Sequence, residues 1–133
     1  MKHAKTFRQP PGIHHSTIYS QMVTVPAGSR TIYLGGQNAS DAEGNLVGGI
    51  DLAAQVTQIM KNIEILLASE EAGFQDLIKL TIYLLAGTDA NAGFQAYLDY
   101  AGQREPPPLI TVLFVAGFAR PGCLVEIDGI AVL

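Results

Sequence analysis

Two carboxylates near the end of the chain have a spacing that suits acid–base chemistry. Glu126 and Asp128 alternate within Cys123 to Val132, where β-branched residues predict a strand. Alternate residues of a strand point to the same face, so these two groups would lie roughly 6.6 Å apart along it. Such a pair can divide the roles of acid and base. The alternative is that one carboxylate is solvated or lies at an interface.

Three further residues could contact a ligand. Tyr19 could orient a bound molecule through its hydroxyl, or it could be a strand tyrosine packed at an interface. Gly35 and Gly36 are too few for a phosphate-binding loop, so we expect them to let the backbone approach a pocket or a neighbouring subunit.

The sequence has no P-loop, dinucleotide-binding or serine-hydrolase motif, and we therefore predict no cofactor.

We predict no metal site either. His14 and His15 are adjacent, so in an extended segment their side chains would point in opposite directions. A metal site needs three or four convergent ligands, and no matching set of histidines and cysteines occurs elsewhere. The two histidines are interpreted as structural or as part of a pocket rim. Cys123 is interpreted as a small buried side chain.

Composition limits the partners and the location. The chain has 133 residues, 48% of them hydrophobic and 15% charged, with a net charge of −4 and one cysteine. We expect a single domain over residues 1–133. No basic cluster is present, which argues against nucleic acid or an anionic membrane as the main partner. No signal-type run or membrane-spanning run is present, and a lone cysteine fits the cytoplasm, which is the predicted location.

The pattern of apolar residues and turn residues predicts two helices among several strands. We expect Tyr19 to Val25 and Arg30 to Leu34 to pair as a hairpin, with Gly35-Gly36 ending the second strand. The later strands are predicted at Ile78 to Leu85, Leu109 to Val115 and Cys123 to Val132. The continuous apolar run of Leu109 to Val115 predicts a central strand that is buried on both faces.

The first helix is predicted over Asp51 to Ala72, with Asp51 as its N-cap and Gly73 as a left-handed stop. One apolar stripe includes Val56, Ile59 and Leu66, whereas Gln55 is placed on another face. The second helix is predicted from the Thr88-Asp89 cap through Ala101. The resulting order, β-β-α-β-α-β-β, indicates a two-layer α+β domain with both helices on one face of a mixed sheet.

The strands carry apolar residues at nearly every position. Two helices cover only one face of such a sheet, so the other face must be buried as well. Oligomerisation through that second face is the simplest way to bury it.

Several short segments occur in a specific order along residues 12–133. They are Tyr19-Ser20-Gln21, Gly35-Gly36-Gln37, Asp41 to Val47, Gln55 with Asn62, Lys79 to Leu84 and Val125 to Val132. Together they resemble the Rid/YjgF family, also called the reactive-intermediate deaminase or L-PSP endoribonuclease-like family. The resemblance implies a chorismate-mutase-like fold. It also implies a homotrimer with pockets in the clefts between subunits.

The resemblance also implies roles for individual residues. Deaminating members of the family have an arginine that clamps the substrate carboxylate, and Ile110 occupies that position here. The family's water-activating acid matches Glu126, and its N-terminal tyrosine matches Tyr19. The implied catalytic residue is Glu126, and the implied substrate-binding residues are Tyr19, Gly35, Gly36, Ile110 and Thr111.

Replacement of the arginine separates family membership from family activity. Isoleucine cannot bind a carboxylate, and an unpaired buried carboxylate is costly. One hypothesis is an imine or enamine deaminase-like hydrolase with an altered substrate range, in which Glu126 activates water. The alternative is a non-catalytic protein of accessory or stress type that binds a small molecule in the same pocket. An apolar pocket would favour binding, whereas polar groups converging on Glu126 would favour catalysis.

Overall fold

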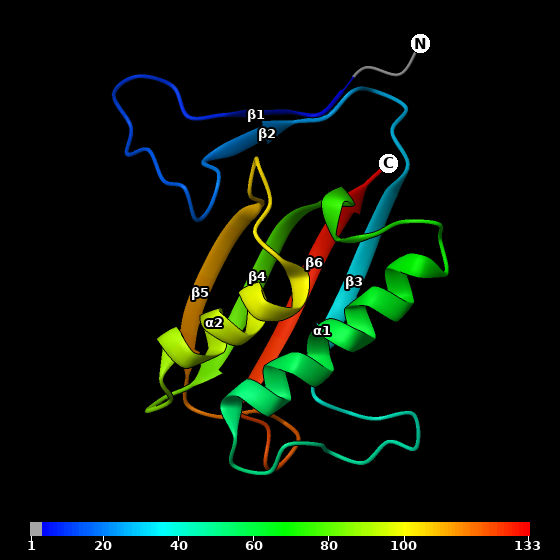
Figure 1. Ribbon diagram of the computed structural model, residues 1–133, viewed down its shortest axis with the longest axis vertical. Helices are drawn as coiled ribbons and strands as arrows, with labels where there is room; N and C mark the ends of the chain where they lie inside the picture. The colour runs from blue at the N-terminus through cyan, green and yellow to red at the C-terminus, as the bar shows by residue number, and fades with distance from the viewer. Residues whose placement is uncertain (1–3) are drawn as a thin grey trace.

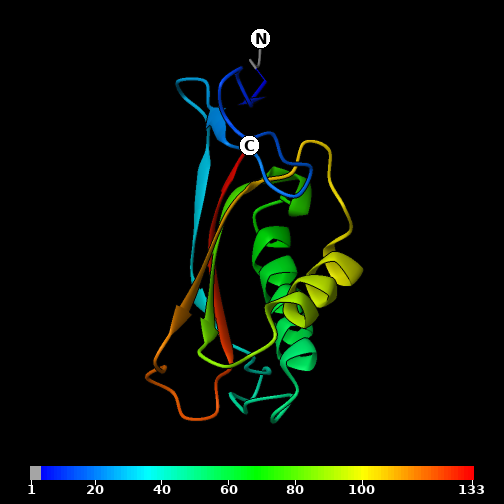
Figure 2. The ribbon, with the colours of Figure 1, turned by 90° about the vertical axis from the view of Figure 1, so that its left-hand side faces the viewer.

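The computed structural model describes residues 4–133, which form two main layers. Figure 1 shows a sheet with two helices, and Figure 2 shows both helices on the same face of it. This arrangement confirms the predicted α+β class. The elements in chain order are β1 (Thr6–Arg8), β2 (Met22–Thr24), β3 (Thr31–Gln37), α1 (Leu52–Ala68), η1 (Phe74–Asp76), β4 (Leu77–Leu85), α2 (Ala90–Ala101), β5 (Leu109–Val115) and β6 (Val125–Val132).

The main sheet is mixed and has the order β3-β6-β4-β5. β5 runs parallel to β4, whereas β6 is antiparallel to both β4 and β3. The prediction of β5 as a central strand is therefore wrong, because β5 is an edge strand. Val112 is 46% exposed and Phe114 is 57% exposed. A continuous apolar run does not distinguish a central strand from an edge strand whose apolar side chains line a cavity.

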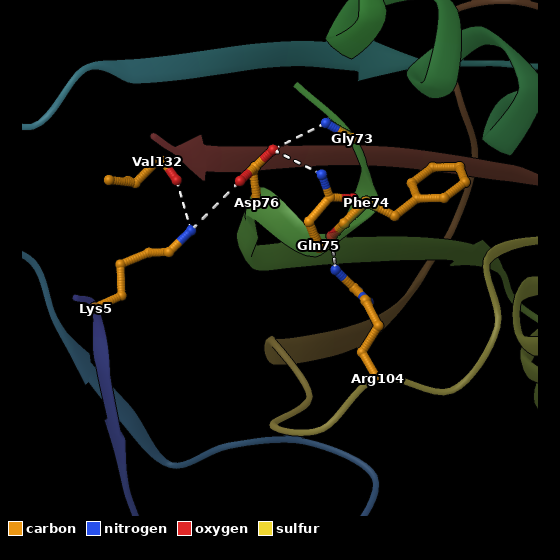
Figure 3. Close-up of polar contacts among 7 residues, drawn as sticks. All are labelled: Lys5, Gly73, Phe74, Gln75, Asp76, Arg104 and Val132. Carbon is orange, nitrogen blue, oxygen red and sulfur yellow. Dashed lines mark hydrogen bonds and ion pairs between the residues drawn. The ribbon is translucent and has the colours of Figure 1, made fainter. Parts of the chain in front are cut away.

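The predicted hairpin between the first two strands is also wrong. β2 pairs instead with β1, a short strand that the sequence pattern did not reveal, and the two form a separate sheet. β3 pairs with β6 at the far end of the chain. Lys5 holds the N-terminal segment against the end of β6. Its Nζ donates to the carbonyl of Val132 at 2.6 Å and lies 3.8 Å from the carboxylate of Asp76 (Figure 3).

Capping of the helices agrees with the sequence at their N-termini. The side chain of Asp51 accepts from the N–H of Ala54, and the side chain of Asp89 caps α2 in the same way through Asn91. The end of α1 differs from the prediction, because the helix stops at Ala68. Gly73 has an extended φ of −144°, and the left-handed residue after the helix is Glu71.

The core lies between α1 and the sheet. The stripe of α1 that includes Val56 and Ile59 is buried as predicted, but Leu66 is 39% exposed and lies off the stripe. The prediction that Gln55 lies on another face of α1 is wrong, because Gln55 is fully buried. Its amide donates to the carbonyls of Gly49 and Gly122 and accepts from the N–H of Leu124. These bonds satisfy the buried amide and fix α1 against the turn before β6.

The sheet face opposite the helices, here called the open face, is not apolar throughout. Polar side chains run along its two central strands; they are Lys79, Thr81, Tyr83, Glu126 and Asp128. The open face is therefore less apolar than the content of apolar residues in the strands suggests, because β4 alternates polar and apolar residues. Within residues 4–133, no helix has the length and apolar character needed to cross a membrane.

Candidate functional site

A cavity of about 310 Å³ lies between α2 and the β5 edge of the sheet; we call it the β5 cavity. Tyr19 and Ile110, two of the predicted site residues, line it together with Phe94 and Tyr97 of α2. Its wall is mainly apolar and, among the described residues, contains no charged side chain. A cavity of this size and character suits a small, largely apolar ligand.

Ser20 positions the segment that carries Tyr19. Its N–H donates to the carbonyl of Pro108 at 3.1 Å, and its hydroxyl donates to the carbonyl of Pro107 at 2.5 Å. Ser20 is buried, so these bonds are shielded from water and tie the segment to the entry of β5. Ser20 is not among the site residues that the sequence predicts, and its only signal in the sequence is its place beside Tyr19 in the family-like segment Tyr19-Ser20-Gln21.

Glu126 and Asp128 lie on the open face, on the opposite side of the sheet from the β5 cavity. They share one face of β6, as their alternation predicted. In the pairing of β6 with β4, Glu126 is opposite Tyr83 and Asp128 is opposite Thr81. The hydroxyl of Tyr83 donates to the carboxylate of Asp128 at 3.2 Å.

The two carboxylates affect the titration of Tyr83. The negative charge of Asp128 is the largest cause that raises the pKa of the phenol above its usual value. Burial, the hydrogen bond to Asp128 and the charge of Glu126 raise this pKa further. Tyr83 therefore remains a protonated hydrogen-bond donor on the open face over a wide pH range.

Gly36 makes room for the carboxylate of Glu126. A Cβ added at Gly36 would lie 2.7 Å from Oε2 of Glu126, which is closer than real contacts allow. The neighbouring Gly35 has open space around its Cβ position. The two glycines therefore have different roles, and Gly36 is the one that allows a close approach.

β3 continues through both glycines with a shift of register between Leu34 and Gln37, so the predicted strand end at this point is wrong.

Cys123 is buried, and burial is the main cause that raises the pKa of its thiol. Arg120 lowers this pKa and Glu126 raises it further. A thiol whose pKa is raised is a weak nucleophile at neutral pH. Across residues 4–133, no group of three or more histidine, cysteine or acidic side chains is arranged to hold a metal ion.

The predicted site residues do not meet in one place within a single chain. Ile110 pairs with Leu80, whereas Thr111 pairs with Thr81, so these two neighbours point to opposite faces of the sheet. Thr111 accepts from Nζ of Lys79 at 3.2 Å on the open face. Tyr19 and Ile110 thus belong to the helix side, and Thr111 and Glu126 belong to the open face.

A family model described as Endoribonuclease L-PSP matches residues 12–133, which is most of the chain. The chain belongs to this Rid/YjgF family. A Yersinia pestis protein, YyfB, described as a conserved Rid-family protein of unknown function, has a similar structure. The TM-score is 0.83 at 30% identity, and the match covers 97% of this chain and 98% of that one. Family and fold are therefore confirmed.

Two relatives show how far the Rid-family resemblance extends in sequence. Protein DfrA of Myxococcus xanthus is 36% identical over 115 residues, covering 86% of this chain and 84% of the relative. A human protein named 2-iminobutanoate/2-iminopropanoate deaminase is 30% identical over 115 residues, covering 86% of this chain and 79% of the relative. A deaminase therefore occurs among the relatives of this chain.

Proposed function

We propose that this Rid-family protein binds a small ligand in the β5 cavity and hydrolyses an imine or enamine there as a homotrimer. The observation that carries the proposal is the separation of the two halves of the site. Among the described residues, Tyr19 and Ile110 line a cavity that has no acidic side chain in its wall, and Glu126 lies on the open face and does not line that cavity. Apposition of the open face of one copy with the β5 edge of another would bring the halves together.

The chemistry requires one general base. The carboxylate of Glu126 takes a proton from water as the water oxygen bonds to the carbon of the C=N group. That proton passes to the nitrogen and gives a carbinolamine. The carboxylate then takes the proton of the new hydroxyl and delivers it to the amine nitrogen as the C–N bond breaks, so that ammonia and a carbonyl product leave. The phenol of Tyr19 is the cavity group that would orient the ligand through a hydrogen bond.

Ile110 determines the substrate range in this proposal. It replaces the family's carboxylate clamp, and no lysine or arginine among the described residues lines the β5 cavity. A carboxylate next to the reacting carbon would lose its hydration without gaining a cation. We therefore expect substrates whose reacting carbon bears uncharged groups, and only slow turnover of 2-iminoacids.

A second candidate function is non-catalytic binding of a small molecule, and the apolar wall of the β5 cavity favours it. This function uses the same cavity but does not need Glu126 or a second copy. A cytoplasmic location is part of both proposals, because the single cysteine is a free buried thiol.

Ammonia release distinguishes the two functions. The wild-type protein is given 2-iminopropanoate and, separately, a neutral aliphatic imine, each generated in situ, and is compared with Glu126→Gln. We expect turnover of the neutral imine and a loss of about a hundredfold or more in the variant, which is the usual contribution of a general base. Glu64→Gln on the exposed surface of α1 is the matched control and should retain full activity. Wild-type turnover no greater than that of Glu126→Gln would reject catalysis and leave binding.

A further inference from the structure

A second cavity of about 250 Å³ adjoins the β5 cavity and shares three wall residues with it, Ile18, Phe94 and Tyr97. Its wall also includes Arg104, so we call it the Arg104 cavity. It lies at the C-terminal end of α2, beside the segment that leads into β5. Its remaining lining is polar or apolar but uncharged; those residues are Thr17, Leu98, Gly102, Gln103, Pro107 and Pro108.

Arg104 brings one positive charge to a wall that has no negative charge. It is the only charged side chain among the described residues that line the two cavities. Its guanidinium donates to the carbonyl of Phe74, as Figure 3 shows, and to the hydroxyl of Tyr97 at 2.8 Å. Both acceptors are neutral. Within residues 4–133, Arg104 forms no ion pair, and its buried Nε has no hydrogen-bond partner. A half-buried cation that lacks a counter-ion favours the binding of an anion.

Tyr97 adds a second donor at the junction of the two cavities. Its side chain is 3% exposed and lines both of them. A guanidinium cannot accept a hydrogen bond, so the hydroxyl of Tyr97 is the acceptor in its bond with Arg104. The hydroxyl hydrogen of Tyr97 is thus left without an acceptor in the part of the chain that the structure describes. The residues Arg104 and Tyr97 therefore both line the Arg104 cavity and both have a donor hydrogen without an acceptor in the described part of the chain.

We propose that the Arg104 cavity binds the carboxylate of a small apolar acid, whose hydrocarbon body lies in the β5 cavity. The inference rests on the proposed ligand cavity, but it requires neither Glu126 nor a second copy. The inference also states where the negative charge of the ligand lies. Arg104 does not line the β5 cavity and Ile110 does not line the Arg104 cavity, so the carboxylate is held away from Ile110. The ligand is therefore a monoanion whose charge lies at the end remote from Ile110.

Calorimetric titration with two probes of equal length tests this assignment. Octanoate and octanamide have the same hydrocarbon chain and differ in the charge of the head group. We expect the wild-type protein to bind octanoate at least about tenfold more tightly, because hydrogen bonds to charged groups are stronger than neutral ones. In Arg104→Gln, the ratio of the two affinities should fall to about one. Tyr97→Phe, which keeps the ring, should reduce the ratio about threefold.

Arg120→Gln is the matched control. The guanidinium of Arg120 also bonds neutral acceptors, in this case Ser40 and Gly44, but it lines neither cavity. The ratio should therefore be unchanged in this variant. Equal wild-type affinity for the two probes, or an unchanged ratio in Arg104→Gln, would overturn the inference. The wild-type comparison and Tyr97→Phe decide the matter even where Arg104→Gln fails to fold.

The outcome is separable from that of the proposed hydrolysis. Binding of octanamide without a preference for octanoate rejects the anion site and leaves the β5 cavity and its chemistry intact. Preference for octanoate in a protein without imine turnover supports the anion site and rejects the hydrolase.

Discussion

In the proposed function, the helix side of the sheet and the open face supply complementary halves of one site. The helix side has a cavity with an apolar wall, Tyr19 and Ile110, but no carboxylate among its described lining residues. The open face has Glu126 and Asp128 with Tyr83, but these groups line neither the β5 cavity nor the Arg104 cavity. In that proposal, the helix side holds the small molecule and the open face activates water. The proposal therefore predicts that substitutions on the helix side change ligand binding, whereas substitutions on the open face change turnover.

The largest effect is expected from restoring a cation to the β5 cavity. Ile110→Arg supplies the guanidinium fork that binds a carboxylate in two parallel hydrogen bonds. We expect kcat/KM for 2-iminopropanoate to rise about tenfold to a hundredfold, the equivalent of one or two charged hydrogen bonds. Ammonia release measures this change. Ile110→Met, which has no charge, is the control for altered packing, and an equal rise in both variants would contradict the proposed role of position 110.

The next largest effect is a loss of imine turnover caused by a substitution on the open face. Gly36→Ala places a Cβ where Oε2 of Glu126 now lies, so the carboxylate must move. We expect imine turnover to fall about tenfold, the scale on which displaced catalytic groups lose activity. Octanamide should bind unchanged, because the β5 cavity lies on the other face. Gly35→Ala is the control, since its Cβ meets open space. Equal activity of the two variants would show that the position of Glu126 does not matter.

A smaller effect concerns the Tyr19 segment on the helix side. Ser20→Ala removes the buried hydroxyl that donates to the carbonyl of Pro107. The free energy of unfolding should fall by about 1–3 kcal/mol, the cost of leaving a buried group unsatisfied. Urea denaturation measures it. Ser69→Ala is the control, because its hydroxyl bonds the carbonyl of Leu66 at an exposed position. A loss in Ser20→Ala no larger than in the control would contradict the positioning role of Ser20.

The smallest effect is a pH dependence of stability on the open face. The pKa of Tyr83 is raised in the folded chain, mainly by Asp128. The stabilisation from this group is fully present below the unfolded pKa of about 10 and is lost as the pH rises through the folded pKa. Wild-type stability should therefore fall more steeply above pH 10 than that of Tyr83→Phe. Parallel stability profiles of the two proteins would show that Asp128 does not affect the titration of Tyr83.

Local sequence signals predicted the features that depend on nearby residues. The N-cap of Asp51, much of the apolar stripe of α1 and the alternation of Glu126 with Asp128 all follow from spacing within one element. The ordered motifs also predicted the family and its fold. The split of the site was partly predictable, because Ile110 and Thr111 are adjacent in one strand and must therefore face opposite sides.

Features that depend on distant partners could not be read in this way. β2 pairs with β1, and β3 pairs with β6. The sequence of a short strand does not indicate which other strand it will pair with. Gln55 looks like a surface residue in a helical pattern. It is buried because Gly122 and Leu124, about seventy residues away, satisfy its amide. The proposed role of Arg104 depends on the fold, because the cavity that it lines is formed by three parts of the chain: α2, the pair Thr17 and Ile18, and the segment before β5.

The measurement that tests the central claim most directly mixes two inactive variants. Ile110→Trp fills the β5 cavity but keeps Glu126, and Glu126→Gln keeps the cavity but lacks the base. If each site joins the cavity of one copy to Glu126 of another, co-assembled mixtures should recover about a quarter of wild-type imine turnover, as random pairing of equal amounts predicts. Mixtures that remain as inactive as the two variants alone would contradict a site shared between copies.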